Sequence, residues 1–149
     1  MNLSELCNRN PVVAFTDTPV PQAARLMRER HVGSLVIVRE RQGQRFPVGI
    51  LTDRDIVVAT VAKDVDPRGL TAGDIMSGDL VTLPEGAAVG DALGAMRERG
   101  IRRLPIIGEG GALAGIVTLD DMLSAVGAEL MDFVRVVDWQ RAKEAALRG

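Results

Sequence analysis

Residues 20–38 read VPQAARLMRERHVGSLVIV, and residues 89–107 read VGDALGAMRERGIRRLPII. The tetrapeptide Met-Arg-Glu-Arg occurs unchanged in both stretches. A second block follows each of them: residues 49–60, GILTDRDIVVAT, match residues 115–126, GIVTLDDMLSAV, after a connection that is shorter in the second copy. Two matching blocks in the same order indicate a tandem duplication, and this repeat decides the fold.

Each copy predicts the same order of elements. The first block has apolar residues at helical spacing, followed by a short run of branched residues typical of a strand. The second block predicts a return strand and then another helix, and a short lead-in strand precedes the first helix. The first copy places these elements at residues 11–14, 20–27, 32–38, 48–51 and from Thr52 on; the second places them at residues 80–83, 89–96, 101–107, 115–117 and from Thr118 on.

The repeat unit is therefore strand–helix–strand–strand–helix, an α/β unit that is too small to bury a stable core alone. Two units packed sheet to sheet would share one core. The stretch 64–73, with its Asp-Pro pair and glycines, is the expected linker. We assign the first repeat with its lead-in to residues 1–66, the second repeat to residues 67–130 and a C-terminal helical tail to residues 131–149.

The C-terminal helix carries an apolar stripe. Leu130, Phe133, Val134 and Val137 fall on one helical face, with Trp139 nearby. Such a stripe suits a partner helix or a second subunit. The alternative is that the helix packs back onto the chain's own sandwich.

Composition excludes several classes of function. The 46% hydrophobic and 26% charged residues indicate a globular protein. The chain has 18 basic and 20 acidic residues, and 3% of its residues are aromatic. The lack of excess positive charge and the scarcity of aromatic side chains for stacking argue against nucleic-acid binding. One cysteine and one histidine exclude a disulfide framework and a multi-Cys or two-His metal site. The chain shows neither an apolar leader nor a run that could span a membrane, so we expect a cytoplasmic protein with no membrane partner.

Both second helices begin with Thr-x-x-Asp, at Thr52 and Asp55 and again at Thr118 and Asp121. One interpretation is a capping box, in which threonine and acid satisfy free backbone N–H groups. The other is a ligand site, because a helix N-terminus suits phosphate and an Asp can accept two hydrogen bonds from a ribose diol. The threonine can cap while the carboxylate points outward, so both interpretations stay open.

Three arginines are candidates for binding an anion. Arg54 lies inside the first Thr-x-x-Asp, where the helix dipole mildly opposes a cation. Arg102 and Arg103 enter the second copy's strand, where the first copy has Gly33 and Ser34. Adjacent strand residues face opposite ways, so only one of this pair should reach a given pocket. We hypothesise that Arg54 and one of the pair bind the same anionic group across the repeat interface; the alternative is that all three are solvated surface residues.

No catalytic constellation is found. No motif places a serine or cysteine nucleophile near His31, and we expect this residue to cap a helix end or lie at the surface. Asp120 and Asp121 lie about 100° apart on a helix and so do not face each other as an acid–base pair. Residues 108–113 begin like a dinucleotide fingerprint but lack its last glycine, and a strand follows them. The sequence therefore predicts neither an enzyme nor a metal site.

These residues resemble a known family, the paired cystathionine-β-synthase (CBS) domains known as the Bateman module. The resemblance is carried by GILTDRD at residues 49–55, GIVTLDD at 115–121, RRLPII at 102–107 and GDIMS at 73–77, and it covers residues 8–130. It implies a pseudo-twofold pair of repeats with two clefts between them. The implied ligands are adenosine compounds: AMP, ADP, ATP or S-adenosylmethionine, with Mg²⁺ as a companion of ATP.

The resemblance also implies roles for particular residues. Ribose binding falls on Asp55 and Asp121, with Thr52 and Thr118 near the sugar or phosphate. The phosphate-facing basic positions fall on Arg54, Arg102 and Arg103. The adenine pocket falls on Val13, Ala14, Val32, Thr82, Leu83 and Ile101. No catalytic cofactor is implied.

Departures from the family pattern make the two clefts unequal. Gly33 and Ser34 replace the basic pair in the first repeat, and Asp120 replaces the basic residue in the second, so one cleft is expected to be weaker or empty. We expect a non-catalytic regulatory module, forming a homodimer, that binds an adenosine ligand and signals to an unidentified protein by a conformational or oligomeric change. The alternative is an interaction or oligomerisation module with degenerate clefts.

Overall fold

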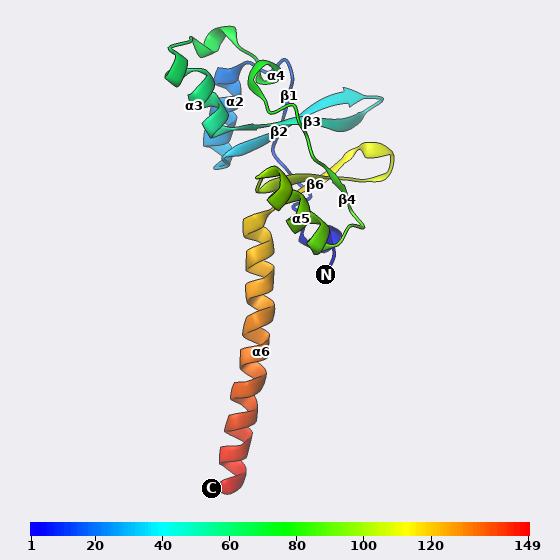
Figure 1. Ribbon diagram of the computed structural model, residues 1–149, viewed down its shortest axis with the longest axis vertical. Helices are drawn as coiled ribbons and strands as arrows, with labels where there is room; N and C mark the ends of the chain where they lie inside the picture. Colours follow the sequence, from blue (N-terminus) through cyan, green and yellow to red (C-terminus); the bar gives the residue numbers. More distant parts are fainter.

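Each repeat forms a three-stranded sheet, as the α/β repeat pattern predicts. The structure is a computed structural model that describes residues 1–149 (Figure 1). The first sheet has the order β1 (Val13–Phe15), β2 (Ser34–Arg41), β3 (Gln44–Thr52), and the second has the order β4 (Leu83–Pro84), β5 (Arg103–Ile107), β6 (Leu113–Thr118). In both sheets the lead-in strand pairs parallel to the central strand, and the return strand pairs antiparallel to it. The two sheets thus have the same topology.

The helices also repeat. The principal helices are α2 (Val20–Arg30) and α3 (Asp53–Ala59) in the first repeat, and α5 (Val89–Arg99) and α6 (Leu119–Arg148) in the second. Three short 3₁₀ turns lie at Val61–Lys63, Pro67–Gly69 and Glu109–Gly111. His31 caps the C-terminus of α2 and Gly100 caps that of α5, both with left-handed φ, and the amide N–H of each donates to a carbonyl four residues earlier. This geometry confirms His31 as a helix cap.

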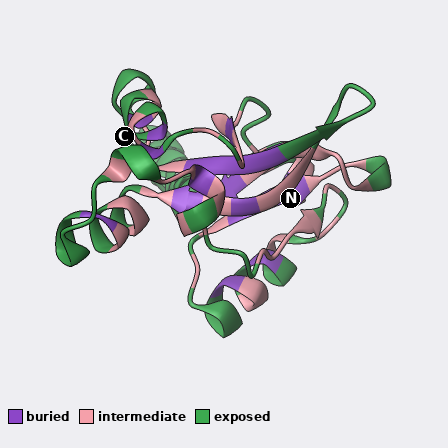
Figure 2. Ribbon diagram, turned by 90° about the horizontal axis from the view of Figure 1, so that it is seen from above, coloured by how far each residue is buried: buried purple, intermediate pink, exposed green.

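The buried side chains form two clusters, one per repeat, so the single shared core that we expected is wrong. Leu35 and Ile37 of β2 belong to the first cluster, and Leu104 and Ile106 of β5 belong to the second. Each sheet buries one face under its own helices, and that face already holds a separate core. The sheets still pack on each other, because the alternate residues of β2 are also fully buried. Figure 2 shows the buried stretches along these strands.

Two short helices that the sequence analysis missed link the repeats. Helix α1 (Leu3–Leu6) precedes the first repeat, yet Leu3 is fully buried in the core of the second. Helix α4 (Ala72–Ile75) precedes the second repeat, yet Ala72 is fully buried in the core of the first. The lead-in segments therefore cross between repeats, and a boundary drawn between residues 66 and 67 does not separate two independent cores.

The crossing segments run close to glycines of the return strands. The amide of Ser77 donates to the Ile50 carbonyl at 2.9 Å, and the amide of Asn8 donates to the Ile116 carbonyl at 2.8 Å. A Cβ on the neighbouring Gly49 would lie 2.8 Å from the Ser77 carbonyl oxygen. The residues at the predicted starts of the lead-in strands still belong to the segments that cross from one repeat to the other. For this reason β1 and β4 start two to three residues later than the predicted lead-in strands.

Helix α6 is a single helix of 30 residues. It contains both the expected last helix of the second repeat and the expected tail. Its only buried residue is Met122, Leu119 at its start packs against the second core, and beyond its first turns the helix projects away from the sheets (Figure 1). The alternative in which the helix packs back onto the chain's own sandwich is therefore wrong. None of the helices has the length and apolar character needed to cross a membrane.

Candidate functional site

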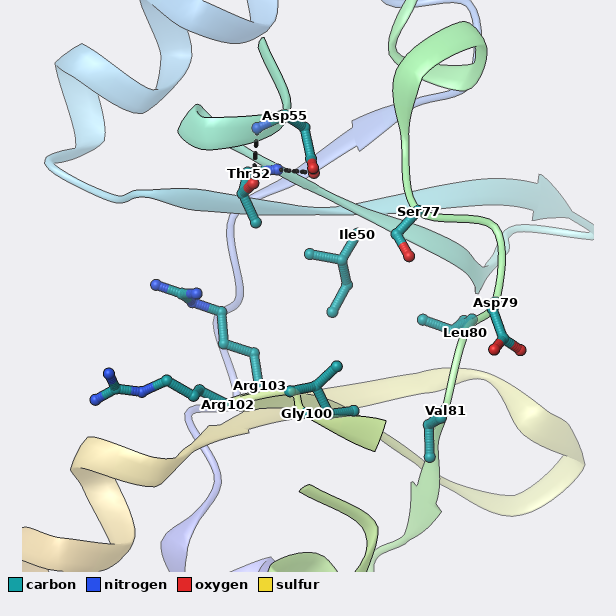
Figure 3. A pocket seen from close by; sticks show the side chains of 11 residues that line it. Ile50, Thr52, Asp55, Ser77, Asp79, Leu80, Val81, Gly100, Arg102 and Arg103 are labelled. Atoms are coloured by element: carbon teal, nitrogen blue, oxygen red, sulfur yellow. Dashed lines mark hydrogen bonds between the residues drawn. The ribbon is translucent and has the colours of Figure 1, made fainter. Parts of the chain in front are cut away.

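A cleft of about 280 Å³, which we call the interrepeat cleft, lies between the two repeats (Figure 3). Strand β3 and the start of α3 form one wall, the segment before β5 forms the opposite wall, and the connector between α4 and β4 closes one side. The lining residues are Ile50, Thr52, Asp55, Ser77, Asp79, Leu80, Val81, Gly100, Ile101, Arg102 and Arg103.

A capping box at the start of α3 holds the first-repeat wall. The amide of Asp55 donates to Thr52 Oγ1 at 3.0 Å, and the amide of Thr52 donates to Asp55 Oδ2 at 2.8 Å. This confirms the capping interpretation of the motif. Asp55 Oδ1 accepts no hydrogen bond within the chain, and Asp55 lines the cleft. One carboxylate oxygen thus remains available to accept a hydrogen bond from a ligand.

Two arginines of the second repeat lie across the cleft from Asp55. Both Arg102 and Arg103 line it (Figure 3), so the expectation that only one would reach a given pocket is wrong. The alternation of strand side chains does not apply to the pair, because β5 begins only at Arg103. Arg102 pairs with Asp120 at 3.0 Å, whereas Arg103 forms no ion pair or side-chain hydrogen bond. Arg103 is therefore a free cation in the cleft.

The other end of the cleft is apolar. Ile50, Leu80, Val81 and Ile101 supply its hydrophobic lining, and Figure 3 shows Leu80 and Val81 on the opposite side from the arginines. Asp79 lies at this end, where its carboxylate is paired with Arg99 at 2.8 Å. The cleft thus places an apolar region, a carboxylate acceptor and a cationic end within one cavity. This combination suits a ligand with a flat apolar group, a hydroxyl-bearing centre and an anionic group.

Arg54 does not line the interrepeat cleft. It borders a neighbouring hollow of about 390 Å³ together with Lys63 and Asp74, and this hollow shares Asp55 with the cleft. The structure therefore brings Arg102 and Arg103 together at the cleft but places Arg54 on the far side of Asp55. The hypothesis that Arg54 and one of the pair bind the same anionic group therefore requires a ligand that extends past Asp55.

The residues expected around the adenine are spread over several places. Ile101 lines the interrepeat cleft. Ala14 is 3% exposed and belongs to the first core, Val32 packs against that core, and Leu83 packs against the second core. Thr82 does not line the cleft. Because the lead-in strands begin late, Leu80 and Val81 take the apolar positions in the cleft, while Ala14 and Leu83 turn into the cores.

Thr118 and Asp121 form the matching capping box at the start of α6, with Asp121 Oδ2 accepting from the Thr118 amide at 3.1 Å and from its hydroxyl at 2.7 Å. Neither residue lines the interrepeat cleft. They lie at the counterpart of this cleft, the place that the symmetry of the two repeats relates to the interrepeat cleft. There, Gly33 and Ser34 stand where the cleft has its two arginines, so no cation from the strand reaches this position.

The lead-in of the first repeat borders a separate hollow of about 430 Å³. Val13 lines it, with Arg30, Arg45 and Arg9. Arg9 pairs with Glu85 at 2.6 Å, and the hydrogen bond from this pair raises the pKa of the guanidinium. Val13 therefore faces a basic surface hollow and not the interrepeat cleft.

Several lining residues were missed by the sequence analysis. Leu80 and Val81 lay within a predicted strand but were not singled out, and Ile50 lay between motif residues. The only sequence signal that could have identified them as lining residues is their place beside residues or segments already chosen as candidates. Ser77 ends the GDIMS motif at residues 73–77 but was given no role in a site, and Asp79 had no signal in the sequence; only the crossing of the connector brings them to the cleft.

The chain is similar to known proteins over most of its length. An uncharacterized protein of Methanopyrus kandleri is 37% identical over 123 residues, which cover 83% of this chain and 61% of that protein. Hypoxic response protein 1 of Mycobacterium tuberculosis is 37% identical over 100 residues, which cover 67% of each chain. The chain therefore spans about three fifths of the length of the first relative and two thirds of the second.

Solved structures share the fold. A CBS domain protein from Pyrobaculum aerophilum complexed with AMP has a TM-score of 0.73 and 26% identity, and the match covers 81% of this chain and 89% of that one. The CBS domain pair of protein MJ0100, in complex with 5′-methylthioadenosine and S-adenosyl-L-methionine, has a TM-score of 0.72 and 25% identity, covering 85% and 99%.

The family model for the CBS domain matches residues 3–62 and again residues 72–128. The two matches coincide with the two sheets and include the short helices α1 and α4 that begin the repeats. The chain therefore belongs to the CBS domain family, and it carries the domain as a tandem pair.

Proposed function

We propose that this protein is a non-catalytic regulatory module that binds an adenosine nucleotide in the interrepeat cleft. The observation that carries the proposal is the free oxygen of Asp55 opposite Arg102 and Arg103, with an apolar region beside them. The AMP complex of the Pyrobaculum aerophilum protein, which shares the fold, supports this ligand class.

The charges of the cleft favour a phosphate-bearing ligand. Asp55 would accept from a ribose hydroxyl, and the two guanidinium groups would bind the phosphate oxygens. The base would lie against Ile50, Leu80 and Val81. S-adenosylmethionine, which protein MJ0100 binds, carries a sulfonium cation that the arginines would repel. AMP, ADP and ATP, the last with Mg²⁺, are therefore the first ligands to test.

We infer that binding is signalled through α6. Asp120, in the first turn of α6, pairs with Arg102 at 3.0 Å, and Arg102 lines the cleft. A phosphate on Arg102 would compete with Asp120 for the same guanidinium group. The ligand would then change the contacts that fix the start of α6, so it would bind the conformations with and without these contacts with different affinity. A ligand shifts the populations of two conformations only through such a difference in affinity. A protein partner or a second copy of the chain would sense the position of the helix.

A second function has its own support. The long exposed surface of α6 is what an oligomerisation module would present, whether or not the clefts bind a ligand. This alternative predicts self-association that is indifferent to nucleotides.

The test is thermal unfolding of the full chain with AMP, ADP, ATP and S-adenosylmethionine, each with and without Mg²⁺. A ligand at a hundred times its dissociation constant stabilises the folded state by about 2.7 kcal/mol. At this chain length that corresponds to a rise in Tm of about 5–10 °C. The absence of a shift with every ligand at millimolar concentration would contradict the proposal and favour the oligomerisation module.

Matched variants locate the site. Asp55→Asn keeps the shape of the capping side chain but removes its charge, so it should reduce the nucleotide-induced shift. Asp91→Asn is the control, because Asp91 accepts from the Ala88 amide at 2.9 Å in the same way but lies outside the cleft. An equal loss of the shift in both variants would mean that the effect is one of stability and not of ligand binding.

A further inference from the structure

Helix α6 has no partner within the chain for most of its length. Its 30 residues make a helix about 45 Å long. Met122, in the second turn, is its only buried residue. From there the helix extends beyond the two sheets without returning to them (Figure 1).

The exposed part of α6 is strongly apolar. Ten of the sixteen large hydrophobic side chains that are exposed in this chain lie on α6, so most of the exposed large hydrophobic side chains belong to this one helix. Monomeric proteins rarely leave a contiguous apolar patch of this kind open to water. The surface therefore indicates an interface.

Six of these side chains lie on one helical face, which we call the α6 stripe: Leu123, Val126, Leu130, Phe133, Val134 and Val137. They recur at intervals of three and four residues, the spacing by which one helix packs along another. The stripe covers four turns, or about 21 Å of helix. Trp139 lies on the opposite face, about 180° from Leu130.

The charges of α6 determine which helix fits the stripe. Residues 119–134 contain four acidic side chains and no basic one, whereas residues 135–149 contain four basic and two acidic side chains. A second copy of α6 in parallel orientation would place like charges side by side. In antiparallel orientation, the acidic half of each helix would meet the basic half of the other, which is favourable for both encounter and specificity.

We propose that α6 is a homodimerisation element that pairs, antiparallel, with α6 of a second copy of this chain. The two stripes overlap around Leu130, which removes the exposed apolar surface of both copies at once. The pairing does not depend on nucleotide binding, so it stands or falls separately from the proposed function.

The first experiment is the molar mass of the full chain by light scattering over a range of concentrations. The wild-type chain should self-associate, and the double variant Leu130→Glu with Val137→Glu should raise the dissociation constant by more than about 100-fold, since core positions of an interface dominate its affinity. Trp139→Glu, on the opposite face, is the matched control and should associate like the wild type. A monomeric wild type, or association that the stripe variant leaves unchanged, would overturn the proposal.

A second variant avoids the apolar residues. Arg141→Glu with Lys143→Glu makes the basic half of α6 acidic, so it should weaken association and reduce its dependence on salt. Unchanged circular dichroism in either variant would show that the helix still forms. Unaltered association in the charge variant would overturn the antiparallel assignment.

The orientation is measured directly with a spin label. In a Cys7→Ala background, a label at Gln140→Cys would be about 30 Å or more from its counterpart in an antiparallel pair centred on the stripe, and about 10 Å away in a parallel pair. The shorter distance, or a monomer that binds a different protein through the stripe, would contradict pairing with a second copy in this orientation.

Discussion

Gly49 marks the place where the connector to the second repeat passes closest to the first sheet. A Cβ at this position would lie 2.5 Å from Met76 Sδ and 2.8 Å from the Ser77 carbonyl oxygen. The methionine side chain can move aside, but the carbonyl belongs to the backbone segment that bonds Ile50. Gly49→Ala must therefore push the connector away from β3.

The expected cost follows from this contact. Overpacking of a tight site lowers the free energy of unfolding by about 1–3 kcal/mol. Alanine also restricts the unfolded chain more than glycine does, which offsets about 0.4–1 kcal/mol of this loss. The net loss of about 1–2 kcal/mol lowers Tm by about 2–8 °C for a chain of this size. Gly94→Ala is the control: no atom lies within 4 Å of its Cβ position in the middle of α5, so it should raise stability by up to about 1 kcal/mol.

The same contact connects stability to the ligand. Ser77 lines the interrepeat cleft, so Gly49→Ala should also reduce the stabilisation by nucleotide. Gly115→Ala makes the equivalent clash, 2.7 Å from the Asn8 carbonyl oxygen, on the other side of the molecule. It should lower Tm but leave the nucleotide shift intact. Thermal unfolding measures all three variants, and a Gly49→Ala protein that unfolds at or above the wild-type temperature would refute the close approach.

The remaining predictions concern single interactions. Thr118→Ala removes the cap of α6 and should cost about 0.5–2 kcal/mol in a urea titration; no loss would mean that the cap is not needed. Arg102→Gln should change stability by less than about 1 kcal/mol, because its pair with Asp120 is exposed to solvent; a larger loss would contradict this. The hydrogen bond from Arg68 lowers the pKa of Asp66 below its ordinary 3.8. The interaction of the two side chains therefore stabilises the folded state at pH values above 3.8, and this stabilisation is lost as the pH falls through the lowered pKa. An NMR titration should show the pKa of Asp66 rising in Arg68→Gln, and an unchanged pKa would exclude that cause.

Much of the fold follows from the repeat itself. The helical spacing at Val20 and Val89 and the branched runs that became β2 and β5 predicted the elements, because their periodicity reflects burial against their own sheet. Helices α1 and α4 were not predictable from such patterns. Each has four residues, and each is stabilised by burying one residue, Leu3 or Ala72, in the core of the other repeat.

The candidate site was predictable where it is built from local motifs. Thr52 and Asp55 could be found because a capping box has a fixed spacing. The positions of Leu80, Val81 and Asp79 depend on how the connector crosses between sheets, which is a property of tertiary structure. The course of α6 was likewise left open, because an apolar stripe suits the chain's own sandwich and a second subunit equally well.

Isothermal titration of AMP into the full chain and into the double variant Arg102→Gln with Arg103→Gln tests whether the interrepeat cleft binds the nucleotide. We expect one site per chain, because only the interrepeat cleft has the arginine pair, and an affinity at least about tenfold lower in the variant. Arg28→Gln, an exposed arginine on α2, should bind like the wild type. Two equal sites per chain, or an affinity that the double variant leaves unchanged, would contradict the assignment of the cleft.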